Sequence, residues 1–120
     1  MQKLVNLIND VSEKSFKEKK KTYLIIDLDN QKYLITEKIL EENSEIENNL
    51  PEEIFIFKAK NSTVEKESGT ITFTFFPDGT KEFGMIYLEN KKDGKVYTLF
   101  LEPYSTKTEI YDGEIYFENF

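Results

Sequence analysis

The sequence predicts a single α+β domain, residues 1–120, in which an amino-terminal amphipathic helix packs on antiparallel β-sheet. Apolar residues recur at helical spacing over residues 1–20, and they alternate with polar residues in most segments after residue 22. Short turns connect these alternating segments without a second helical pattern, and such connections favour antiparallel neighbours. A chain of 120 residues is long enough to bury one hydrophobic core without disulfides.

Residues 1–20 are predicted to form the helix. Leu4, Ile8 and Val11 share one face at helical spacing, while mostly charged and amide side chains occupy the other, so we expect the apolar face to be buried. Lysines cluster between Lys17 and Lys21 at the carboxyl end, where positive charge complements the helix dipole. This cluster is either a solvated helix end or a contact for an anionic membrane or a partner.

Residues 22–120 are predicted to form the antiparallel β region. Two strands, near residues 23–28 and 32–39, surround an Asp29-Asn30 turn, and a third strand covers residues 54–60. Residues 40–53 between them are rich in glutamate and poor in apolar side chains, which is typical of an exposed acidic loop.

A hairpin is predicted over residues 70–89. Apolar residues alternate with threonines from residue 70 to 75, which indicates a strand with one buried face. Pro77 fixes φ at the first turn position, Asp78 follows, and Gly79 can take the left-handed conformation that closes a short hairpin loop. We therefore expect the strands on either side of this turn to pair with each other.

The remaining strands are predicted to continue the meander. A strand over residues 96–102 follows a turn at Asp93-Gly94, and the segment of residues 106–111 leads to a second turn at Asp112-Gly113. The last strand is expected within residues 114–120.

Composition disfavours several classes of function. The chain has no histidine and no cysteine, so it lacks the usual general base near neutral pH and the commonest ligands of transition metals. All its basic residues are lysines and the net charge is −7, which makes nucleic acid an unlikely partner. The acidic loop has neither the ligand spacing nor the glycine of an EF-hand. We expect no enzymatic activity, no cofactor and no metal site.

The order of these parts resembles the globular part of minor pseudopilins of the H type and related type IV pilin-like proteins. Ile71 and Phe73 precede the Pro-Asp-Gly-Thr sequence of residues 77–80, as in that family, and Tyr97 to Leu99 matches a later strand. The resemblance implies a pilin-like fold, in which Leu4, Ile8 and Val11 dock the helix onto the sheet.

The same resemblance implies a structural role, in which the chain is a minor subunit of a type II secretion pseudopilus or a type IV pilus-like fibre. Its partners would be other pilin or pseudopilin subunits, and charge alone makes the acidic loop a candidate contact. The membrane helix of the family is missing from these residues. The chain would then be the periplasmic part of a protein that a preceding helix anchors in the inner membrane. The candidate contact residues are Glu41, Glu42, Glu45 and Glu47.

An alternative function follows from the strands alone. The chain would then be a stand-alone small β-rich domain that binds a ligand or a protein partner.

Overall fold

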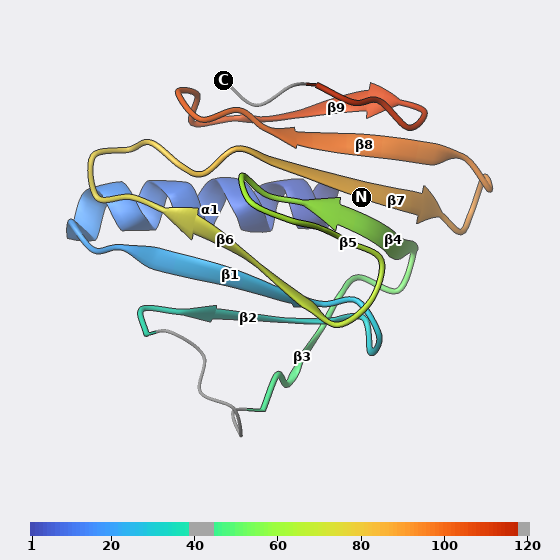
Figure 1. The fold of residues 1–120 in the computed structure, drawn as a ribbon, viewed down its shortest axis with the longest axis horizontal. Coiled ribbons are helices and arrows are strands. Elements are labelled where there is room, and N and C mark those ends of the chain that lie inside the picture. The colour runs from blue at the N-terminus through green and yellow to red at the C-terminus, as the bar shows by residue number, and fades with distance from the viewer. Residues whose placement is uncertain (39–44, 118–120) are drawn as a thin grey trace.

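The computed structural model describes residues 1–38 and 45–117, and these form a helix followed by β-strands (Figure 1). The elements are α1 (Gln2–Glu18), β1 (Thr22–Asp27), β2 (Lys32–Thr36), β3 (Asn48–Asn49), β4 (Ile54–Lys60), β5 (Glu65–Lys66), β6 (Thr70–Phe75), β7 (Gly84–Asn90), β8 (Val96–Leu101) and β9 (Thr108–Asp112).

Helix α1 buries its apolar face and ends sharply. Leu4, Ile8 and Val11 are at most 3% exposed, because their spacing places them on one side of the helix. The helix ends at Lys19, which adopts a left-handed conformation with φ of 54°. The Ser15 hydroxyl donates a hydrogen bond of 3.3 Å to the carbonyl oxygen of Phe75, so the end of the helix is attached to β6.

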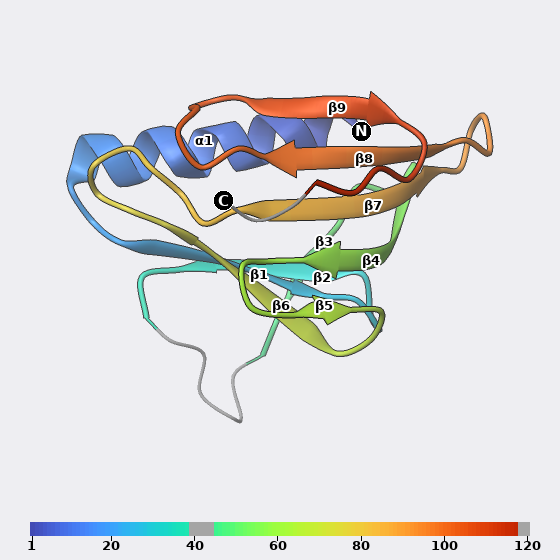
Figure 2. The same cartoon turned by 45° about the horizontal axis from the view of Figure 1, so that its top comes forward.

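The strands form two antiparallel sheets, with the orders β3-β2-β1-β6 and β5-β4-β7-β8-β9. Helix α1 contacts β1 and β6 of the first sheet and β9 of the second; it lies behind β6 and β7 in the view of Figure 1 and behind β8 and β9 in that of Figure 2. Side chains from the helix, from β1 and β6, and from β4, β7 and β8 belong to a single buried cluster. The two sheets and the helix therefore share one hydrophobic core.

The pilin-like fold predicted from the sequence is wrong, although the coarser description as α+β with an amino-terminal helix holds. The strands after the acidic loop do not extend the first sheet, because β4 pairs with β7 and starts a second one. Strand β6 then returns to the first sheet and pairs with β1 along its whole length. This alternation between sheets separates the strands into sets of four and five.

The hairpin predicted over residues 70–89 exists only at its turn. An isolated bridge joins Phe75 to Lys81, and the Glu82 amide donates a hydrogen bond of 2.8 Å to the Thr74 carbonyl oxygen. Beyond these contacts the strands diverge, since β6 pairs with β1 and β7 pairs with β4 and β8. The Pro-Asp-Gly turn thus connects the two sheets and does not join neighbours within one.

The strand predicted in residues 114–120 is also corrected. Residues 114–117 lie outside the strands, and residues 118–120 are not described. The chain from Gly113 to Phe117 instead crosses the outer face of the five-stranded sheet, on the side away from the shared core, where the ring of Phe117 packs on Phe100.

Candidate binding groove at the carboxyl end of the helix

An open groove of about 310 Å³ lies where three segments meet. One wall comes from the carboxyl half of α1, the floor from the turn between β6 and β7, and the other wall from the loop between β8 and β9. The lining residues are Ser12, Glu13, Phe16, Asp78, Gly79, Thr80, Tyr104 and Thr106.

The turn between β6 and β7 is held by its own hydrogen bonds. Oδ1 of Asp78 accepts hydrogen bonds from the Thr80 amide, at 2.9 Å, and from the Thr80 hydroxyl, at 2.6 Å. The bond from the Thr80 hydroxyl is the largest contribution that lowers the pKa of Asp78 below its usual value, so this carboxylate is ionised at neutral pH. Gly79 has φ of +93°, the left-handed conformation that the Pro-Asp-Gly sequence predicts.

Phe16 forms the helix side of the groove and remains 48% exposed. A Cβ atom on Gly79 would lie 3.2 Å from Cδ2 of Phe16, so the glycine lets the turn approach the ring closely. Nζ of Lys19 lies 3.9 Å from the centre of the same ring. The ring therefore already attracts one ammonium group from its own chain.

The loop that carries Tyr104 is attached to the turn through Lys81. The Lys81 amide donates a hydrogen bond of 3.1 Å to the Pro103 carbonyl oxygen, and its Nζ donates one to the Ser105 carbonyl oxygen. Burial lowers the pKa of the Lys81 amine below the usual lysine value. Tyr104 itself is 82% exposed, so a fixed loop presents a large free ring to solvent.

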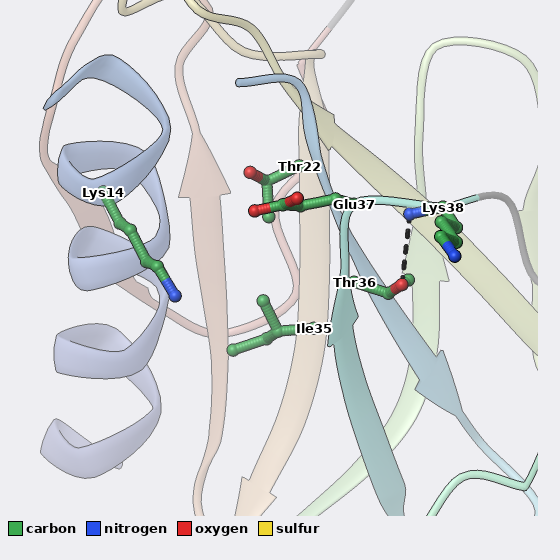
Figure 3. A pocket seen from close by; sticks show the side chains of 6 residues that line it. All are labelled: Lys14, Thr22, Ile35, Thr36, Glu37 and Lys38. Atoms are coloured by element: carbon green, nitrogen blue, oxygen red, sulfur yellow. Dashed lines mark hydrogen bonds between the residues drawn. The ribbon is translucent and has the colours of Figure 1, made fainter. Parts of the chain in front are cut away.

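A second hollow of about 360 Å³ lies between α1 and the end of β2, and it is a weaker candidate (Figure 3). Lys14 extends from the helix toward Ile35 and Glu37, while Lys38 points away on the far side. Glu37 is paired with Lys20 at 3.6 Å. The described residues that line this hollow therefore supply neither an exposed aromatic ring nor an unpaired carboxylate.

The structure places the residues singled out in the sequence at three separate locations. Pro77, Asp78 and Gly79 form the turn at the groove, whereas Leu4, Ile8 and Val11 are buried in the core. Of the acidic contact candidates, Glu45 and Glu47 are exposed on a segment that does not line the groove, and Glu41 and Glu42 lie outside the described residues.

Sequence reasoning missed the aromatic walls of the groove. Phe16 belongs to the apolar stripe of residues 1–20, whose helical spacing predicts a buried face, but the structure leaves it 48% exposed. Tyr104 follows Pro103 in a loop, and this position outside the strand alternation was the only available signal of its exposure. Within residues 1–38 and 45–117, no three acidic side chains gather closely enough to hold a metal ion.

Comparisons with known proteins give no relative: no protein-family model matches the sequence, and no curated protein or solved structure matches it significantly. None of the helices in the described part of the chain has the length and apolar character needed to cross a membrane.

Proposed function

We propose that this chain is a non-catalytic binding domain that recognises a partner protein through the groove at the carboxyl end of α1. The observation that carries the proposal is the pair of exposed aromatic rings, Phe16 and Tyr104, that line one groove. Exposed aromatic rings that flank a hollow are typical of the anchor points of protein interfaces.

The charges of the groove indicate what it would bind. Among the residues that the structure describes, Glu13 and Asp78 line the groove and no basic side chain does, although Lys19 lies over the ring of Phe16. A lysine or arginine side chain of a partner fits this lining, because its apolar stem can lie against the rings while its cationic end meets the carboxylates. Because Lys19 already lies over Phe16, we expect the cationic end of the partner's side chain at the two carboxylates and not at this ring.

The residues that line the groove also favour a binding function over a catalytic one. The ionisable side chains in the groove are Glu13, Asp78 and Tyr104. None of them is a histidine, cysteine or lysine, the groups that most often serve as base or nucleophile near neutral pH.

Assembly with other pilins in a secretion pseudopilus or pilus-like fibre stays a prediction, together with the periplasmic location and the inner-membrane anchor. The resemblance that implied this role also implied the pilin-like fold, which is wrong, so we favour recognition of a partner through the groove.

A displayed library of random peptides, panned against the immobilised chain, tests the proposal. We expect the selected peptides to contain a lysine or arginine next to apolar residues. Tyr104→Ala should weaken their binding by about tenfold or more, as is usual for an aromatic anchor. Replacement of the basic residue of a selected peptide by norleucine, which keeps the stem and removes the charge, should weaken binding about two- to fivefold.

The matched control is Phe55→Ala, which removes an aromatic ring that is 41% exposed on β4, away from the groove. Its affinity for the selected peptides should equal that of the unchanged chain. Peptides that bind Tyr104→Ala as tightly as the unchanged chain, or a selection dominated by acidic peptides, would contradict the proposal.

A further inference from the structure

The outer face of the five-stranded sheet carries a second apolar cluster, separate from the shared core. Phe83, Met85, Tyr87 and Phe100 form this aromatic face, and each is at most 6% exposed. The segment of residues 113–117, here named the strap, covers part of this face. The strap is thus a short peptide segment that lies across the face of a sheet in the same chain.

The strap is held by hydrogen bonds from buried side chains of the sheet. Thr98, which is fully buried, donates through Oγ1 to the Gly113 carbonyl oxygen at 2.7 Å and accepts from the Ile115 amide at 3.0 Å. The hydroxyl of Tyr87 donates to the Ile115 carbonyl oxygen at 2.9 Å. These bonds pair three backbone groups of the strap, the Gly113 carbonyl and the amide and carbonyl of Ile115, without a strand ladder.

Aromatic contacts fix the end of the strap. The ring of Phe117 stacks on that of Phe100, with centres 4.9 Å apart, and the ring of Tyr116 lies 5.1 Å from that of Tyr87. Nζ of Lys58 donates to the Tyr116 hydroxyl at 2.6 Å. The face thus recognises both the backbone and the consecutive aromatic side chains of the strap.

A turn at Gly113 directs the strap onto its own sheet, and the Gly113 amide donates a hydrogen bond of 2.8 Å to the Val96 carbonyl oxygen of β8. Gly113 has φ of +82°, in the left-handed region that favours glycine, and a Cβ there would meet nothing within 4 Å. The contacts made by residues beyond this turn would be the same if the strap came from another molecule. The short connection keeps the strap at a high effective concentration, which favours the closed monomer.

From this arrangement we infer that the aromatic face is a peptide-binding surface whose alternative occupant is the strap of a second copy of this chain. Opening at Gly113 would exchange straps between two copies and give a closed, symmetric dimer. This inference is independent of the proposed function, since the strap does not line the groove beside α1.

The test is Gly113→Val, measured by size-exclusion chromatography with light scattering over a range of concentrations. Valine disfavours the closed turn because a β-branched residue is strained at positive φ, and an opened hinge relieves that strain. We expect the dimer dissociation constant to fall by about tenfold or more relative to the unchanged chain.

The matched control is Gly94→Val, since Gly94 has φ of +70° in another turn and equally open surroundings. It carries the same local strain but directs no strap, so it should stay as monomeric as the unchanged chain. Within the Gly113→Val background, adding Thr98→Val removes the bonds to the strap backbone, and adding Phe117→Ala removes its ring anchor; either should abolish the dimer.

Two results would overturn the inference. Gly113→Val could remain monomeric, as Gly94→Val is expected to do, which would show that the strap does not exchange. Alternatively, the dimer could survive both Thr98→Val and Phe117→Ala, which would place the contact on some other surface.

Discussion

Gly79 is the residue that lets the turn between β6 and β7 form the floor of the groove. Gly79→Val should lower the free energy of unfolding by about 1–3 kcal/mol, because valine is strained at φ of +93°. Its Cβ would also lie 3.2 Å from Cδ2 of Phe16. Urea unfolding followed by circular dichroism measures the loss. The control is Gly94→Val, because a Cβ at position 94 would meet nothing within 4 Å. Its free energy of unfolding should fall by less than that of Gly79→Val. Equal losses of free energy would show that the contact with Phe16 contributes nothing.

The sequence predicts the conformation of a single residue only where its nearest neighbours in the chain determine that conformation. The left-handed conformation of Gly79 follows from Pro77 and Asp78 before it, and the turn forms as these residues predict. The exposure of Phe16 depends instead on where α1 extends past the core, which helical spacing does not encode. The groove itself was therefore not predictable, although its floor was.

For strands β6 and β7, the sequence predicts the strands themselves but not the neighbours with which they pair. Alternation identified both strands, and the turn between them was correctly placed near residues 77–79. Alternation does not say which neighbour a strand pairs with, because each strand has two edges. Here β6 satisfies one edge with β1, whereas β7 lies between β4 and β8, so the predicted pairing fails after its first residues.

Strands β6 and β7 belong to different sheets and approach each other closely at Phe73 and Gly84. A Cβ atom on Gly84 would lie 2.6 Å from Cε1 of Phe73, which is fully buried. Gly84→Ala should therefore lower the free energy of unfolding by about 1–3 kcal/mol through overpacking. Thermal unfolding of Gly84→Ala, Phe73→Leu and the double variant measures the coupling. The double variant should lose less than the sum of the single losses, and strictly additive losses would refute the contact.

At the level of the whole molecule, one core under two sheets implies one cooperative unit. Ile8 is fully buried in the cluster to which both sheets contribute. Ile8→Ala should lower the free energy of unfolding by about 2–5 kcal/mol, the usual cost of such a cavity. Amide hydrogen exchange measures the stability of each sheet separately. We expect the free energy of protection of the amides in β1 and in β7 to fall by the same amount in Ile8→Ala.

The matched control for this experiment is Val64→Ala, which shortens an apolar side chain that is 41% exposed. It should leave the exchange of both sheets nearly unchanged, because little buried surface is lost. If Ile8→Ala lowered the protection of β1 but not that of β7, the five-stranded sheet would be stable without the helix. The shared core would then be a contact between two separately folded parts, and the cooperative unit inferred from the buried cluster would be wrong.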